Sequence, residues 1–223
     1  MKITKTVKYN YKLTEKTLEK DIDQFIIVAK NRDFSMDRHY GGEGLKMIKQ
    51  YFKILKEKLK NQEFEECKIC YEKLILFCID ASGANECDNL FDYEDLLAKI
   101  TKKFDDHIRD YFICLIKTGS IDELTERISR YAQNLDIYGF DSDKEILLAN
   151  LNKEQLAELE EKMLAKTTGM AKEDKDKQDI IYFLMSMASV SGDKEKYLML
   201  CDKFKDIVND EEFEYLKNGY PDG

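Results

Sequence analysis

Apolar residues recur at every third or fourth position through most of this chain, which is the spacing of one face of an α-helix. The stretch 44–60 shows the pattern most regularly, because its apolar residues fall at Leu45, Ile48, Phe52, Leu55 and Leu59. The 223 residues include one proline and only four valines, so the chain has few helix breakers and few residues that favour strands. These features predict an all-α protein and argue against an all-β fold.

The same periodicity predicts about ten helices, and we expect them to form antiparallel hairpins in a helical-repeat bundle. Three helix starts carry a capping-box spacing, at Ser120, Ser142 and Asn152. The predicted ranges are 14 to about 30, 44–60, 63–81, 93–117, 120–135, a short helix from 142, 152–166, 178–190, 194–208 and 211–218.

The pattern also suggests a domain organisation. We expect residues 14–223 to form a single all-helical domain, with a possible subdivision near 83–92, where a loop interrupts the helices. Residues 1–13 are expected to form a basic N-terminal arm, either a short β-arm or a disordered segment. The charged segment 167–177 is the best candidate for a mobile loop.

Charge is distributed unevenly along the chain. Residues 1–60 carry 15 basic and 8 acidic residues, whereas residues 61–223 carry 21 and 37, within a total net charge of −9. The arm contributes the basic residues Lys2, Lys5, Lys8 and Lys12 and no acidic residue. Such a basic end is typical of a segment that binds nucleic acid or an acidic partner. The alternative is that it lies on the acidic remainder of the chain, and the overall acidity favours this alternative because it repels a phosphate backbone.

The six cysteines are expected to be reduced. The first residues contain no apolar block typical of a secretory signal, so we expect a cytoplasmic protein. Cys67 and Cys70 form a C-x-x-C pair, and with Cys78 and Cys87 they would supply the four ligands of a zinc site. The first three, however, share the apolar face of one predicted helix, and no second C-x-x-C or paired histidine accompanies them. Core packing is therefore the favoured interpretation, and no metal is predicted.

No motif in the sequence supports catalysis, and neither a catalytic residue nor a cofactor is predicted. His107 lies among apolar positions of a predicted helix, which is typical of a packed histidine. His39 lies in a glycine-rich turn before a helix, where exposed backbone N–H groups can bind an anion. A P-loop is absent and Glu43 would oppose a phosphate, so an ordinary loop is favoured over an anion site.

Three helix–turn–helix joints resemble one another. Each combines a short polar turn, an acidic helix start and three apolar residues spaced four and three apart: Cys67, Tyr71 and Leu74; Leu124, Ile128 and Tyr131; Tyr197, Cys201 and Phe204. The joints resemble the tetratricopeptide-like helical hairpin, in which a second helix packs back along the first. The resemblance covers about half of the chain. The joints lie 57 and 73 residues apart, against ~34 in a tandem array, so the repeat is degenerate.

The resemblance implies a non-enzymatic scaffold that presents a groove to a protein or peptide. In this family the first helix of each hairpin faces the groove, which implies the partner-binding residues Lys49, Phe52, Lys56, Arg109, Tyr182 and Met185. Cations with aromatic residues suit an acidic or amphipathic peptide.

Two alternatives stay open. In the first, Phe52 and Met185 belong to the core and not to a binding surface, since Phe52 also lies on the apolar stripe of residues 44–60. In the second, the protein is a nucleic-acid-associated regulatory factor that uses its basic N-terminal third. A membrane partner is not expected, because the longest apolar runs are far shorter than the ~20 residues of a membrane span.

Overall fold

The structure is a computed structural model that describes residues 17–84, 91, 93, 96–133, 142–171 and 174–205. Ten α-helices and no strand occur in these residues, which confirms the all-α prediction. The basic arm, Cys87 and the predicted helix 211–218 lie outside the described residues. The helices are α1 (Leu18–Lys30), α2 (Glu43–Lys60), α3 (Phe64–Ile79), α4 (Leu96–Ile100), α5 (Asp105–Thr118), α6 (Ile121–Ala132), α7 (Ser142–Asn150), α8 (Lys153–Lys166), α9 (Lys175–Val190) and α10 (Lys194–Phe204).

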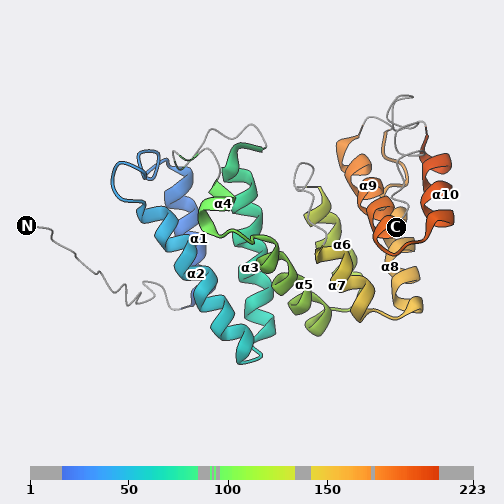
Figure 1. The fold of residues 1–223 in the computed structure, drawn as a ribbon, viewed down its shortest axis with the longest axis horizontal. Coiled ribbons are helices and arrows are strands. Elements are labelled where there is room, and N and C mark those ends of the chain that lie inside the picture. The colour runs from blue at the N-terminus through green and yellow to red at the C-terminus, as the bar shows by residue number, and fades with distance from the viewer. Residues whose placement is uncertain are drawn as a thin grey trace, which may run out of the picture.

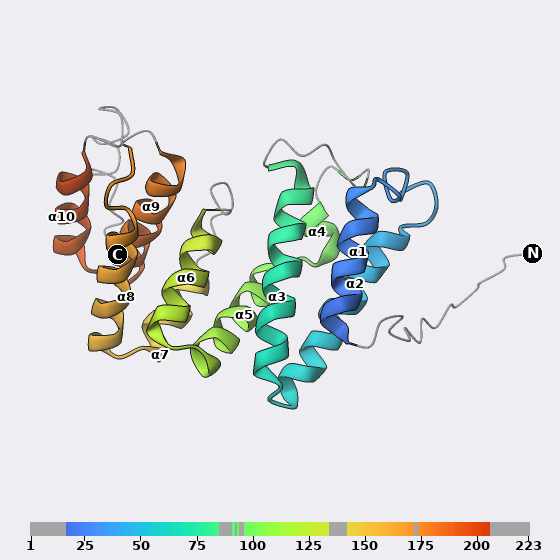
Figure 2. The same cartoon turned by 180° about the vertical axis from the view of Figure 1, so that it is seen from behind.

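Helix α3 is the centre of the N-terminal half of the molecule. It packs against α1, α2 and α5 (Figures 1 and 2), and a π-helical turn at Asp80–Ala84 follows it. Ten of its sixteen residues are buried. Because these residues surround the helix rather than form one stripe, α3 is covered on nearly every side.

The C-terminal half continues the arrangement along the long axis of the molecule (Figure 1). There α5 packs against α7, α6 against α8, and α9 against α10. Buried apolar side chains from α1 to α10 form one core. No helix in the described ranges is long and apolar enough to cross a membrane.

Two of the three similar joints connect helices that pack against each other, namely α2 with α3 and α9 with α10. Each of these turns contains a residue with positive φ, Gln62 at 63° and Gly192 at 73°, which reverses the chain in a few residues. The joint between α5 and α6 differs, because Gly119 and Ser120 are both extended. In the described residues α5 packs mainly against α3 and α7, so the sequence likeness at 118–131 does not correspond to a closely packed helix pair.

Several helix boundaries differ from the predicted ones, and side-chain hydrogen bonds lie at these positions. The predicted helix 93–117 is not continuous: α4 ends at Ile100 and α5 begins at Asp105. In the turn between them the Thr101 hydroxyl accepts a hydrogen bond from the Lys103 N–H (3.3 Å). Ser142 does not cap α7 either. Its hydroxyl donates to the Asp105 carboxylate (2.5 Å) and so joins α7 to α5.

Other helix starts follow the capping chemistry that the sequence shows. Ser120 accepts a hydrogen bond from the Glu123 N–H, and Asn152 and Gln155 form a reciprocal capping box, as predicted. Thr17 rather than Thr14 caps the first described helix. Asp174 caps α9, so this helix begins three residues before the predicted 178 and shortens the connection that precedes it.

The start of α2 depends on Asp37 in the preceding loop. Its buried carboxylate accepts hydrogen bonds from the backbone N–H groups of Gly44 (2.9 Å) and Leu45 (3.3 Å). Gly42 has φ +68°, and a Cβ there would lie 2.8 Å from the Tyr93 hydroxyl, so this position favours glycine. The chain's own carboxylate occupies the place that an external anion would take, which rules against an anion site at this helix start.

Two charged residues of α3 are buried against α6. The Lys68 ammonium lies 2.7 Å from Glu123 and 2.9 Å from Glu65. Glu72 pairs with Arg127 and, at 3.5 Å, with Arg130. Since a buried charge without a partner is costly, these pairs tie α6 to α3.

We expect Asp37→Ala to lower the free energy of unfolding by about 1–2 kcal/mol, because the N–H groups of Gly44 and Leu45 lose their acceptor. Urea unfolding followed by circular dichroism measures the change. Asp33→Ala in the same loop is the control, since Asp33 is exposed and should change stability by less than about 0.5 kcal/mol. Equal stability of the two variants would show that Asp37 does not cap α2.

Candidate functional site

Helix α2 is amphipathic, with apolar side chains toward the core and lysines toward solvent. Ile48, Tyr51, Phe52 and Leu55 are buried. Exposed lysines follow one another at intervals of three or four residues, which places them on one face: Lys46, Lys49, Lys53, Lys56 and Lys60.

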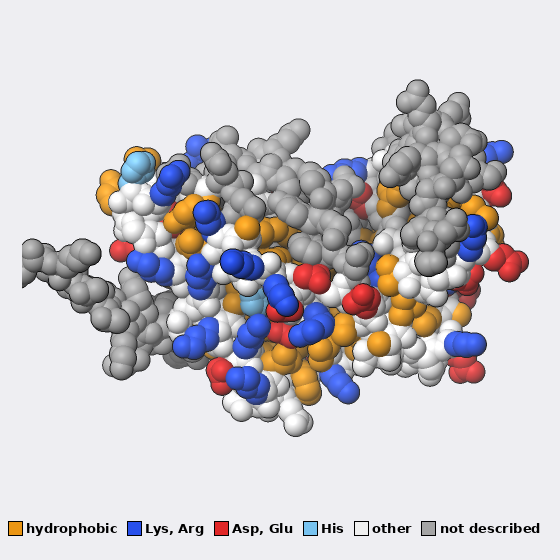
Figure 3. All heavy atoms as spheres, in the orientation of Figure 1, with side chains coloured by type: hydrophobic (Ala, Val, Ile, Leu, Met, Phe, Trp, Pro, Cys, Tyr) orange, Lys and Arg blue, Asp and Glu red, His pale blue; other side chains and the backbone are white. Residues whose placement is uncertain are grey.

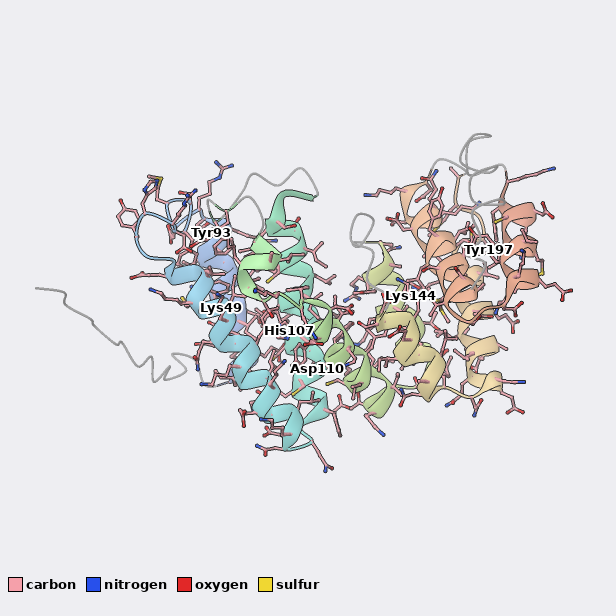
Figure 4. All side chains as sticks on the ribbon, viewed as in Figure 1. Lys49, Tyr93, His107, Asp110, Lys144 and Tyr197 are labelled. Atoms are coloured by element: carbon pink, nitrogen blue, oxygen red, sulfur yellow. The ribbon has the colours of Figure 1, made fainter. Side chains whose placement is uncertain are left out.

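An open pocket of about 360 Å³ lies beside this row of lysines. We call it the lysine pocket. Figure 4 shows Lys49 on α2 and His107 on the neighbouring α5, and Figure 3 shows basic side chains gathered over this side of the molecule. The residues that line the pocket are Lys49, Phe52, Lys53, Lys56, Glu57 and Lys60 of α2, Ile100 of α4 and His107 of α5.

An aromatic pair forms the floor of the lysine pocket. The rings of Phe52 and His107 are nearly parallel, with centroids 3.9 Å apart and 11° between their planes. Phe52 is 2% exposed and His107 is 6% exposed. Among the described residues, Nδ1 of His107 has no hydrogen-bond partner. The pocket therefore combines an apolar floor, one unsatisfied polar atom and a cationic rim.

Burial and neighbouring charges keep the His107 imidazole neutral at pH 7. Burial lowers its pKa to about 4, and the positive charge of Lys56 acts in the same direction, against Asp106. Asp110 lies one turn further along α5, where its carboxylate accepts a hydrogen bond from the Tyr71 hydroxyl (3.3 Å). Burial raises the pKa of Asp110, and the charges of Lys56 and Arg109 oppose the increase. Lys56 and Arg109 thus act on the same carboxylate.

Basic residues of the described chain differ in how they are paired. Lys73 binds Glu19 and Asp23 across α1 and α3, and Lys162 binds Asp122 across α6 and α8. At the pocket, Lys60 lies 2.9 Å from Glu57. Four other cations at or beside the pocket form no ion pair in the part of the chain that the structure describes, and we call them the basic face: Lys49, Lys53, Lys56 and Arg109.

The structure brings together only part of the predicted partner-binding set. Lys49, Phe52 and Lys56 line one pocket, and Arg109 lies on the adjoining α5. Tyr182 and Met185 belong to α9, in the other half of the molecule (Figure 1).

Two side chains of the predicted set are buried, which corrects the expectation that they are exposed. Phe52 is 2% and Met185 3% exposed, so both pack in the core, as the alternative interpretation has it. Tyr182 is half-buried. The alternative set of the basic arm lies outside the described residues.

Sequence reasoning missed five residues that line the pocket: Lys53, Glu57, Lys60, Ile100 and His107. The two lysines continue the three-and-four spacing of Lys49 and Lys56, so the sequence does contain a signal for them. His107 lies 55 residues from Phe52, and no local pattern indicates that the two rings stack.

The cysteines of the C-x-x-C pair are core residues. Cys67, Cys70 and Cys78 are buried free thiols. Burial raises the pKa of Cys70 to about 12, whereas a hydrogen bond with Cys114 lowers the pKa of the buried Cys67 against the effect of burial. Within the described ranges, no three His, Cys, Asp or Glu side chains are placed to hold a metal ion.

A second hollow, of about 200 Å³, lies among Asp21, Phe25, Phe34 and Tyr51. The Tyr51 hydroxyl donates a 2.9 Å hydrogen bond to the Asp21 carboxylate, so the polar atoms that line it bind each other. This hollow lies at the edge of the aromatic core, where the exposed Gln24 also lines it. The lysine pocket, which presents unpaired cations, is the candidate functional site.

Comparison of the chain with protein-family models, with curated proteins and with solved structures finds no match.

The buried imidazole predicts a pH dependence of stability. The unfolded His107 binds a proton below about pH 6.5, whereas the native imidazole does so only near pH 4. The free energy of unfolding should therefore fall as the pH drops through this window, by about 2–3 kcal/mol. The raised pKa of Asp110 changes the free energy of unfolding in the opposite direction. The variant His107→Phe retains Asp110, so the difference between the pH curves of the original protein and this variant isolates the imidazole. Urea unfolding at a series of pH values measures it, and parallel curves for the two proteins would contradict a buried neutral His107.

Proposed function

We propose that this protein is a non-enzymatic binding protein that docks an acidic segment of a partner protein on its basic face. The observation that carries the proposal is the unpaired charge of Lys49, Lys53, Lys56 and Arg109. The whole chain is acidic, at −9, so many carboxylates are available, yet none in the described residues pairs with these cations. Cations arranged in this way complement an acidic surface and steer its approach.

The spacing of the lysines supports a helical partner segment. Lys49, Lys53, Lys56 and Lys60 follow the 3.6-residue period of α2, so their charges form a row about 16 Å long. An amphipathic helix alongside α2 would present glutamates at the same intervals. The apolar floor at Phe52 and Ile100 adds a contact for a nonpolar side chain between those glutamates.

The hairpin resemblance supports the same assignment. We infer a degenerate tetratricopeptide-like scaffold, supported by the packing of α2 on α3 and of α9 on α10 and by the burial of the matching apolar stripes. In such hairpins the first helix faces the partner, and α2 is the first helix of its pair.

Nucleic acid fits the basic face less well than an acidic peptide does. Base recognition on single strands relies on exposed aromatic rings, and the two rings at this site, Phe52 and His107, are buried. The nucleic-acid alternative therefore serves as an outcome of the test.

The test uses a synthetic peptide of about 18 residues with glutamates at the lysine spacing and leucines on the opposite face. Fluorescence anisotropy measures its binding to the full chain. Lys56→Glu with Arg109→Glu should weaken binding at least several-fold and leave the melting temperature nearly unchanged, because exposed charges contribute little to stability. The matched control, Lys20→Glu with Lys153→Glu, changes the net charge equally at exposed lysines away from the pocket and should bind as the original protein does.

Two further measurements separate the alternatives. Deletion of residues 1–13 tests the basic arm: loss of binding there, with normal binding by Lys56→Glu/Arg109→Glu, would move the site to Lys2, Lys5, Lys8 and Lys12. A single-stranded oligonucleotide tests nucleic acid. Tighter binding of the oligonucleotide than of the peptide, with a steep loss between about 50 and 200 mM salt, would contradict a protein partner.

A further inference from the structure

The lysine pocket holds more positive charge than one carboxylate neutralises. Lys49, Lys53 and Lys56 contribute three ammonium groups from successive turns of α2. Glu57 is the one carboxylate among the described lining residues, and it already accepts a 2.9 Å hydrogen bond from Lys60. The charge of Lys60 and, more weakly, that of Lys53 lower the pKa of Glu57, so this carboxylate stays ionised and bound to Lys60.

The floor of the pocket contains a polar group without a partner. His107 is 6% exposed, and its Nδ1 has no hydrogen-bond partner in the described part of the chain. Its packed neighbours are rings, Phe52 at 3.9 Å and Phe104 at 5.8 Å between centroids. A buried polar atom in such surroundings costs free energy unless a ligand atom satisfies it.

From these two observations we infer that the lysine pocket binds a phosphoryl group, so that the acidic partner segment is recognised in its phosphorylated form. The inference rests on the proposed function and names the ligand chemistry of the same site. A phosphoryl group carries nearly two negative charges and three acceptor oxygens, against one charge and two oxygens for a carboxylate. It therefore matches three ammonium groups and, in the His107 tautomer that carries its proton on Nδ1, an imidazole N–H, whereas a carboxylate leaves part of the site unsatisfied.

The charges around His107 set the expected pH dependence. Lys56 faces it from α2, Tyr71 from α3, and Asp106 and Asp110 from its own helix. Since its pKa is about 4, the imidazole stays neutral above pH 5, whereas the phosphoryl group titrates with a pKa near 6. Binding of a phosphorylated peptide should thus strengthen from about pH 5 to about pH 7.

The experiment compares three synthetic acidic peptides that differ at one central position, which is serine, glutamate or phosphoserine. Isothermal titration calorimetry with the full chain should show the phosphoserine peptide binding roughly tenfold more tightly than the glutamate peptide. Inorganic phosphate in excess should displace it, and by itself should bind far more weakly than the phosphorylated peptide does.

Matched variants test which residues provide the preference. Lys53→Gln should remove most of the preference for phosphoserine over glutamate, while Lys60→Gln should retain most of it, because Glu57 already neutralises Lys60. His107→Phe keeps the ring stack on Phe52 and should reduce the preference without abolishing binding of the glutamate peptide. Circular dichroism confirms that each variant is folded.

The outcomes distinguish this inference from the proposed function. Equal binding of the phosphoserine and glutamate peptides would overturn the phosphoryl site and leave the acidic partner supported. Failure of all three peptides to bind would overturn the proposed function itself. Inorganic phosphate that binds as tightly as the phosphorylated peptide would indicate a site for a free anion and overturn recognition of a phosphorylated partner.

Discussion

The burial of α3 on nearly every side is the constraint on which the rest of the structure depends. Helices α1, α2 and α5 cover it, and its residues Tyr71, Leu74 and Cys78 are fully buried. A helix of sixteen residues with this much apolar surface cannot remain stable at a surface, because its exposure to water would cost more than the helix itself contributes. Its neighbours must therefore each supply an apolar face, and each is left with one polar face toward solvent.

The charged residues of α3 extend this constraint to the second half of the chain. Lys68 and Glu72 are 3% and 7% exposed, so each requires a partner of opposite charge. Helix α6 supplies both partners through Glu123 and Arg127. On its other side, Asp122 and Glu126 of α6 pair with Lys162 and Lys166 of α8. Many ion pairs among the described residues thus connect two helices, whereas Lys49, Lys53 and Lys56 on α2 form no ion pair there.

The sequence predicts which segments are helical far better than which helices meet. Periodicity and caps at Ser120 and Asn152 are local, so both are visible in the sequence. The break after Ile100, where the Thr101 hydroxyl accepts a hydrogen bond within the turn, is not visible in the sequence because apolar residues continue across it at helical spacing. The pocket shows the same division: the lysine spacing along α2 is local, whereas the contact of Phe52 with His107 arises from tertiary packing and leaves no local pattern. Similar turns at 118–131 and 191–204 likewise lead to different packing, because extended residues at 119–120 direct the chain away.

The row of lysines on α2 has an energetic consequence that bears on function. Like charges three and four residues apart on a helix repel each other, at about 0.2–0.5 kcal/mol for each pair. Elsewhere in the described chain basic residues at such spacings are offset by acids, as Arg127 is by Glu123 and Lys162 by Glu158. Among the described residues no acid forms an ion pair with Lys49, Lys53 or Lys56. Glu57 near Lys53 and Asp110 near Lys56 offset part of the repulsion, and the remainder lowers the stability of the free protein. An anionic ligand removes that repulsion when it binds. Part of the binding free energy therefore comes from relief of a cost already present in the unbound chain.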